Sequence, residues 1–71
     1  MKDFYEEINR SLTPIEQGRY SQHSLDWCAD RIDWCWKWRK ITYEQMVELA
    51  NRVSSCYDAE IAAMKVAIYR K

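Results

Sequence analysis

The chain has 71 residues, of which 48% are apolar and 31% charged, and it contains one glycine and one proline. That length fits one compact domain, residues 1–71, because two domains would each be too small to hold a core. Eleven basic residues balance eleven acidic ones, so the net charge gives no general attraction to nucleic acid or to an anionic membrane. The apolar runs fall far short of the ~20 residues that span a bilayer, and residues 1–15 lack a signal-peptide core. We therefore expect an intracellular protein without membrane contact.

Helix-forming residues dominate the chain, and no stretch alternates apolar and polar residues with a period of two. Both features predict an all-α fold. The first helix is expected over about residues 4–12, because Asp3 and Glu6 form a capping box at its start. Phe4, Ile8 and Leu12 share one helical face.

A second, very short helix is expected over about residues 14–18. Thr13 can cap it, Pro14 suits a first helical position because that position needs no N–H donor, and Gly18 ends it. The polar residues that follow offer N-caps for a longer helix over about residues 22–39.

The helix over residues 22–39 carries two apolar faces. One is a packing seam formed by Leu25, Cys28, Ala29, Ile32, Cys35 and Trp36. The other, rotated by roughly 120°, is a line formed by Trp27, Arg31, Trp34 and Trp38. One seam is enough to pack against a neighbouring helix, so the second face predicts an exposed patch of the kind that binds other molecules.

The clearest helix start in the chain follows a basic segment. Thr42 and Gln45 form a second capping box, and Lys37, Arg39 and Lys40 complement the negative end of the preceding helix. The two long helices are therefore expected to form a hairpin.

The last helix is expected over about residues 43–69, a length of about 40 Å. Its apolar stripe consists of Met46, Ala50, Val53, Tyr57, Ile61, Met64 and Ile68. The regular stripe favours a continuous helix; the alternative is a break at Ser54-Ser55, whose hydroxyls can compete for backbone groups. The predicted architecture is a small helical bundle in which the short N-terminal helix and turn pack on a long two-helix hairpin.

Chains of this length commonly add disulfides, a metal or a partner subunit, because a core of this size seldom supplies more than about 3–5 kcal/mol. Cys28, Cys35 and Cys56 are an odd number without framework spacing, which argues against disulfides. Cys28 and Cys35 are also too far apart along a helix to share a zinc ion, and His23 lies off the face of Cys28. We therefore expect no metal, no cofactor and a homo-oligomer, with a dimer favoured.

Charge is divided unevenly along the chain. Residues 1–35 carry four cations and seven anions, whereas residues 36–71 carry seven cations and four anions. The two halves therefore attract one another, either within one molecule or across an antiparallel two-fold dimer.

The tryptophan line has three interpretations. In the first, the N-terminal helix folds over the tryptophans and completes the core. In the second, Trp34 and Trp38 belong to a self-association or partner interface, since Trp and Arg are enriched at interface hot spots. In the third, tryptophans beside Lys37, Arg39 and Lys40 stack on nucleic-acid bases. Acidic residues on the same helix and the zero net charge argue against the third interpretation.

No catalytic constellation is present in the sequence. His23, the single histidine, lies in a polar helix start without an adjacent carboxylate or thiol and is expected to be solvent-exposed. One glycine cannot build a phosphate loop, and no serine lies in a nucleophile elbow. Cys28 and Cys35 lie on the packing seam, where cysteine acts as a small buried hydrophobe. The sequence therefore predicts a protein that is not an enzyme.

The stretch from Ser24 to Met46 resembles small uncharacterised proteins of bacterial phages and mobile elements, in which a tryptophan-rich helix leads through an Ile-Thr-x-Glu-Gln turn into another helix. The matching turn in this sequence is Ile41-Thr42-Tyr43-Glu44-Gln45. The resemblance covers about half of the chain. It implies a class of short helical proteins that act by binding, among them anti-CRISPR-like inhibitors of bacterial immunity.

We therefore expect a protein that acts by protein–protein interaction, as a phage-encoded inhibitor of a host defence protein in the bacterial cytoplasm. Its predicted interface consists of Trp27, Arg31, Trp34 and Trp38. The alternative is a small nucleic-acid-binding accessory protein that uses the aromatic and basic cluster over residues 36–40.

Overall fold

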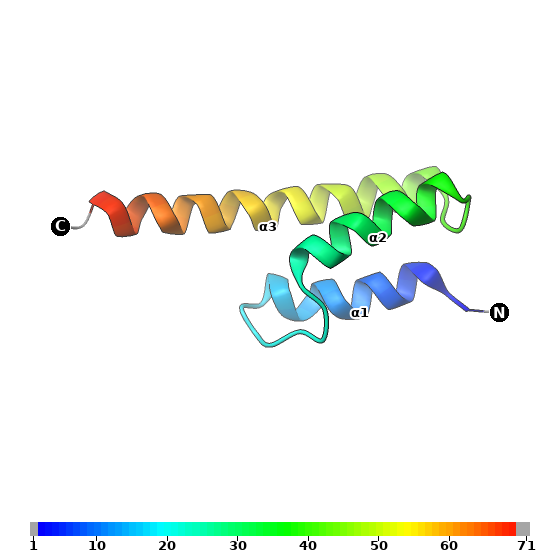
Figure 1. Cartoon of the computed structure of the whole chain (residues 1–71), viewed down its shortest axis with the longest axis horizontal. Helices are drawn as coiled ribbons and strands as arrows, with labels where there is room; N and C mark the ends of the chain where they lie inside the picture. Colours follow the sequence, from blue (N-terminus) through cyan, green and yellow to red (C-terminus); the bar gives the residue numbers. More distant parts are fainter. Residues whose placement is uncertain (1, 70–71) are drawn as a thin grey trace.

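The computed structural model describes the backbone of residues 2–69 and the side chains of residues 2–63. Three helices follow one another: α1 (Phe4–Glu16), α2 (Leu25–Lys37) and α3 (Tyr43–Tyr69). All three pairs of helices are in contact, and no strand occurs in the described part of the chain. The predicted all-α bundle is confirmed (Figure 1).

Each helix begins at a residue whose side chain caps it. Asp3 and Ser24 each accept a hydrogen bond at 3.1 Å from the N–H group three residues on. At the start of α3 the bonds are reciprocal: the Gln45 N–H donates to the Thr42 hydroxyl at 3.1 Å, and the Thr42 N–H donates to Gln45 Oε1 at 3.0 Å. These side chains satisfy amide groups that a first helical turn leaves without partners. The predicted caps at Asp3 and Thr42 are confirmed, and Ser24 is the one of the polar candidates that caps α2.

The predicted break before Pro14 does not form, because α1 runs through Pro14 to its end. Thr13 does not cap a new helix; its hydroxyl donates to the Asn9 carbonyl one turn earlier, at 2.8 Å. Pro14 lies in the last turn, where its missing N–H removes a single helical hydrogen bond. The prediction of two helices over residues 4–12 and 14–18 is therefore wrong, and one helix spans most of both ranges.

Helix α2 is shorter at both ends than the predicted range 22–39. Before the helix, the Ser21 hydroxyl donates to the Ser11 carbonyl at 2.5 Å, and the His23 ring lies 2.7 Å from the Ser11 hydroxyl. These bonds hold the loop against α1 and delay the helix start. After the helix, Arg39 has a φ of 58°, which a right-handed helix does not accommodate.

Helices α1 and α2 end in the same hydrogen-bonded motif with different residues in its left-handed position. After α1, Gly18 has a φ of 69°, and the next N–H donates to the Pro14 carbonyl at 2.8 Å. After α2, Arg39 takes that position, and the Lys40 N–H donates to the Cys35 carbonyl at 2.7 Å. Glycine is usual there because it has no Cβ. A residue with a side chain in this conformation costs about 1–2 kcal/mol of backbone strain.

The core lies between the three helices along the N-terminal half of α3. Its buried apolar residues are Ile8, Leu12, Leu25, Cys28, Ile32, Cys35, Ile41, Leu49 and Val53. The α2 members confirm most of the predicted seam. Two core residues lie outside the predicted faces: Leu49, which is wholly buried on α3, and Ile41, in the α2–α3 turn. Met46 and Ala50, which belong to the predicted stripe, are half-buried.

Helix α3 continues through Ser54 and Ser55, both exposed, so the predicted continuity is confirmed. Its 27 residues give a length of about 40 Å, roughly twice that of the 13-residue α1 and α2. The C-terminal part of α3 therefore extends beyond the other helices (Figure 1). Residues 58–63 are all exposed, and Ile61 is 49% exposed. Within the described side chains, the predicted stripe leaves the core after Tyr57.

Arg52 of α3 ties this helix to α1. Its guanidinium forms a two-pronged ion pair with Glu16 at 3.0 and 2.6 Å, and it also donates to Asn9 at 2.8 Å and to Thr13 at 3.3 Å. Glu48 lies 3.8 Å from the same guanidinium. The hydrogen bond from Arg52 holds the pKa of Glu16 below its usual value. The bonds from Arg52 to α1 join residues that are 36 to 43 positions apart in the sequence.

We expect Arg52→Ala to lower the free energy of unfolding by about 1–3 kcal/mol, because hydrogen bonds to charged groups contribute that much when partly shielded from water. The matched control is Arg10→Ala. Arg10 pairs with Glu6 on the exposed surface of α1, so its loss should be below about 0.5 kcal/mol. Denaturant unfolding followed by circular dichroism measures both values, and equal losses would contradict this role of Arg52.

The effect of Arg52→Ala on the free energy of unfolding should be smaller at acid pH. Because its pKa is lowered in the folded chain, Glu16 contributes stability above its unfolded pKa and loses that contribution as the pH falls through the folded value. The stability difference between wild type and Arg52→Ala should therefore shrink in acid, as denaturant unfolding across an acid pH series would show.

Candidate protein-binding surface

The structure separates the predicted tryptophan line by exposure. Trp27 is half-buried, whereas Trp34 is 39% and Trp38 59% exposed. The His23 ring stacks on Trp27, with ring centres 3.7 Å apart and planes 12° from parallel. The line therefore has a covered end beside the α1–α2 loop and an open end beside the α2–α3 turn.

Helix α1 meets the open end of the line through Phe4. The ring centres of Phe4 and Trp34 lie 5.9 Å apart. Farther along α1, Ile8 and Leu12 are buried in the core instead. The interpretation of the tryptophans as core residues thus fits Trp27, which packs against the core, and does not fit the exposed Trp38.

Arg31 lies at the middle of the line and holds the neighbouring rings. Its guanidinium lies 4.5 Å from the ring centre of Trp34 and 5.4 Å from that of Phe4. Its Nε lies 3.3 Å from the Glu7 carboxylate, which Lys2 approaches at 2.7 Å. The hydrogen bond from Lys2, followed by the charges of Lys2 and Arg31, lowers the pKa of Glu7. Arg31 is therefore ion-paired inside the chain while its guanidinium lies against the rings of Trp34 and Phe4.

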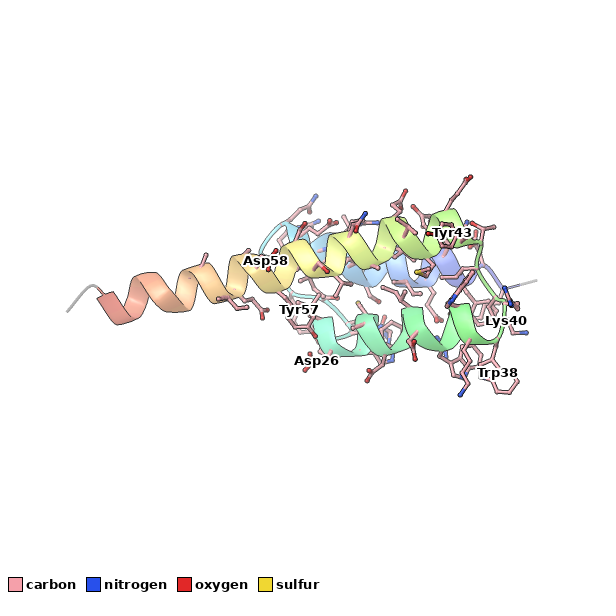
Figure 2. The ribbon with its side chains drawn as sticks, turned by 90° about the horizontal axis from the view of Figure 1, so that it is seen from above. Asp26, Trp38, Lys40, Tyr43, Tyr57 and Asp58 are labelled. Carbon is pink, nitrogen blue, oxygen red and sulfur yellow. The ribbon has the colours of Figure 1, made fainter. Side chains whose placement is uncertain are left out.

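More aromatic side chains lie at the open end. Trp36 and Tyr43 meet edge to face across the α2–α3 turn, with ring centres 5.8 Å apart and planes at 62°. Tyr43 is 63% exposed, and Figure 2 shows Tyr43 at the same end of the molecule as Trp38 and Lys40. We name this end of the molecule the aromatic tip; its aromatic members are Phe4, Trp34, Trp36, Trp38 and Tyr43. Phe4 and Tyr43 lie outside the predicted site, and the sequence signal that they share is a position at the first residue of a helix.

The cations of the predicted nucleic-acid site lie at the aromatic tip as well. Lys37, Arg39 and Lys40 are all exposed. The Arg39 guanidinium lies 5.2 Å from the Trp36 ring centre, and the Lys40 ammonium lies 5.8 Å from that of Phe4. The structure therefore places the two alternative sites at the same end of the molecule (Figure 2).

His23 is half-buried, so the prediction of a solvent-exposed histidine is wrong. Its Nδ1 lies 2.7 Å from the hydroxyl of Ser11, which is itself buried. The physical reason is the stacking on Trp27, which draws the ring onto the surface of α2. The ring lines a cleft of ≈ 600 Å³ together with charged residues of α1. Because the Ser11 oxygen is buried, the Ser11–His23 pair serves to anchor the loop on α1.

The three cysteines are free thiols in chemically quiet surroundings. Cys28 and Cys35 are wholly buried, and Cys56 is half-buried. Burial raises the pKa of each thiol, that of Cys28 to about 11. A raised pKa leaves little thiolate near neutral pH, and the thiolate is the reactive form.

We expect a thiol reagent at about pH 8 to modify Cys56 first, and to reach Cys28 and Cys35 only when the chain unfolds. Mass spectrometry over a time course gives this order. A reductant should leave the melting temperature unchanged, because the thiols are unpaired. Simultaneous modification of all three in the folded chain would show that the seam of α2 is open to solvent.

Other kinds of site find no support in the described part of the chain. No group of three His, Cys, Asp or Glu side chains among the described residues could hold a metal ion. Among the same residues, no helix combines the length and the apolar character needed to cross a bilayer. Comparisons with protein-family models, with curated proteins and with solved structures give no match. The geometry of the aromatic tip therefore carries the functional inference.

Proposed function

We propose that the chain is a non-enzymatic protein that works by docking its aromatic tip on another protein. The observation that carries this proposal is the gathering of exposed Trp34, Trp38 and Tyr43 at one end of an otherwise charged molecule. Trp34 and Trp38 lie one helical turn apart at the end of α2 and form an exposed apolar patch, and such patches mark interaction sites. Tryptophan and tyrosine are also among the residue types most enriched at the energetic hot spots of interfaces.

Several rings of the aromatic tip are held by contacts within the chain, which supports the same proposal. Arg31 and Phe4 hold Trp34, and Trp36 packs against Tyr43. Side chains that are already fixed lose little conformational entropy on binding. Large aromatic rings also supply much contact area for few rotatable bonds.

The narrower proposal is that the partner is a bacterial defence protein and that the chain is a phage-encoded inhibitor acting in the bacterial cytoplasm. Its support is the resemblance of the tryptophan-rich helix and the Ile41–Gln45 turn to small phage proteins. An inhibitor that blocks a surface needs an adhesive patch and no chemistry of its own, which agrees with the inert thiols and with the buried Ser11.

Capture from lysates of bacteria that carry defence systems tests the proposal. The tagged chain should retain a defence protein, and the double variant Trp34→Ala/Trp38→Ala should lose it. Tyr20→Ala is the matched control, since Tyr20 is 92% exposed in the α1–α2 loop, at the opposite end of the bundle from the α2–α3 turn. If the double variant and Tyr20→Ala retain the same proteins, the aromatic tip is not the binding surface.

We further propose that the chain forms a homodimer through the C-terminal part of α3. The support is the exposed Ile61 and, on another face of α3, a groove of ≈ 470 Å³ whose apolar lining includes Ile15, Cys56, Ala59 and Ala63. Most helical stability in proteins comes from packing, and a second copy would supply it to this part of α3.

Light scattering should therefore give at least twice the chain mass of 8.6 kDa. Ile61→Ser should lower this mass, whereas Tyr20→Ser should not. A monodisperse monomer at micromolar concentration would contradict the dimer and leave the aromatic tip untouched.

A second candidate function, binding of single-stranded nucleic acid, is favoured by one observation: the exposed cations beside Trp36 and Trp38. Phosphate contacts weaken steeply with salt, whereas a tryptophan-anchored protein interface does not. Binding measured at two salt concentrations separates the two functions.

A further inference from the structure

The cations of the aromatic tip lack partners within the molecule. Elsewhere in the described part of the chain, four of the five basic side chains pair with a glutamate, namely Lys2, Arg10, Arg31 and Arg52, and the fifth, Arg19, donates a hydrogen bond to Gln17. Among residues 2–63, no carboxylate lies within ion-pair distance of Lys37, Arg39 or Lys40. These three side chains, on either side of Trp38, give the aromatic tip an uncompensated positive charge.

The negative end of α2 does not account for all three charges. Three of its terminal carbonyls already accept hydrogen bonds, because the amides of Trp38, Arg39 and Lys40 donate to the carbonyls of Trp34, Trp36 and Cys35 at 3.0, 3.1 and 2.7 Å. A further stabilising effect of nearby cations is a surface effect that salt screens. Stabilisation of the end of α2 therefore does not explain three cations at this turn.

Arg39 also adopts a left-handed backbone conformation that residues with a Cβ rarely take. Its φ of 58° is the conformation that Gly18 adopts at the corresponding point after α1. The stacking of its guanidinium on Trp36 fixes this charge on the surface of the aromatic tip.

We propose that Lys37, Arg39 and Lys40 form a carboxylate-binding site, and that the protein docked on the aromatic tip presents an acidic segment to it. This inference rests on the proposed function and names the chemistry of its partner. The planar guanidinium of Arg39 suits a two-pronged pair with a carboxylate. The neighbouring rings of Trp34 and Trp38 take the apolar side chains between the acidic ones.

An acidic protein segment fits this surface better than a nucleic acid. Asp33, one helical turn before Lys37, and Glu44, in the first turn of α3, are both exposed and flank the cations. A continuous phosphate backbone would meet these carboxylates, whereas a peptide can place its own carboxylates between apolar residues. Three cations are also few compared with the basic grooves that track a nucleic-acid strand.

The test uses the full chain and two labelled probes of equal charge, a peptide in which glutamate alternates with leucine and an oligothymidylate. The charge variant Lys37→Gln/Arg39→Gln/Lys40→Gln removes the three charges. It keeps a side chain at the positive φ, so the backbone strain is unchanged. Arg39→Lys keeps the charge and removes the guanidinium. Probe anisotropy measures binding, and circular dichroism checks that each variant is folded.

Wild type should bind the peptide about tenfold more tightly than the oligothymidylate, and the charge variant should lose about tenfold for the peptide, with Arg39→Lys between the two. Equal binding of the peptide by wild type and charge variant overturns the inference. Tighter binding of the oligothymidylate also overturns it, because the site would then belong to a nucleic acid. A lower oligomeric mass of the charge variant has the same effect, because a second copy would then cover the site.

Capture from lysate separates failure of this inference from failure of the proposed function. A charge variant that still retains the partner lost by Trp34→Ala/Trp38→Ala overturns the acidic segment and leaves the docking surface standing. Loss of the partner by both variants, with retention by Tyr20→Ala, supports both.

Discussion

Leu49→Ala is expected to leave most of the chain unfolded at room temperature. Leu49 is wholly buried in the core shared by the three helices. Truncation of a buried leucine loses its transfer free energy and leaves a cavity, which together cost about 2–5 kcal/mol. A core in a chain this short supplies about 3–5 kcal/mol in all. Circular dichroism during a urea titration measures the loss in free energy of unfolding.

Ile61→Ala is the matched control for Leu49→Ala, because both residues lie on α3 and Ile61 is 49% exposed. Its effect should lie within about 0.5 kcal/mol for the single chain. A loss as large as that of Leu49→Ala would contradict the exposure of Ile61 in solution. Repeating the measurement at several protein concentrations shows whether a second copy is the cause.

Trp38→Ala is expected to weaken partner binding by about 2 kcal/mol or more, a factor of about 30, with little change in the stability of the single chain. Trp38 is 59% exposed and lies at the open end of the line, so its removal leaves no cavity. Ile32→Ala, on the buried seam of the same helix, should instead cost about 2–5 kcal/mol of folding stability. Calorimetric titration and thermal unfolding give the two quantities for each variant.

Self-association would couple the binding free energy to the folding stability. In a dimer that unfolds as it dissociates, the melting temperature depends on concentration, so its slope has to be compared between wild type and Trp38→Ala. The interface interpretation is wrong if Trp34→Ala and Trp38→Ala both unfold the chain without any concentration dependence and neither affects binding. In that case the two tryptophans are core residues.

The features predictable from the sequence are those decided by near neighbours. Asp3, Ser24 and Thr42 cap helices because a cap needs partners only three residues away. Prediction was wrong at Pro14, where local signals describe a helix start equally well as a last turn. It also missed Arg52, because a pairing with Glu16 across 36 positions has no local signature. Leu49 lies beside the predicted stripe of α3, since two covering helices bury a wider face than one seam requires.

The candidate site was predictable to a similar degree. Helical periodicity placed Trp34 and Trp38 on a face apart from the seam, and both are exposed. Helical periodicity gives no information about the conformation of the α1–α2 loop, so it missed the stacking of His23 that covers Trp27. It likewise could not show that Tyr43, from the far side of the turn, meets Trp36 at the same end of the molecule, because that depends on how α3 crosses α2.

The unequal lengths of the helices also divide α3 into two parts with different local stability. Amides near Leu49 and Val53 belong to a region that all three helices cover, so their exchange with solvent deuterium requires the whole bundle to open. The amides of residues 58–63 have the same helical geometry, but exposed side chains surround them. A single turn there can open without disturbing the core. One continuous helix should therefore show a step in deuterium uptake after Tyr57, and a bound second copy would remove it.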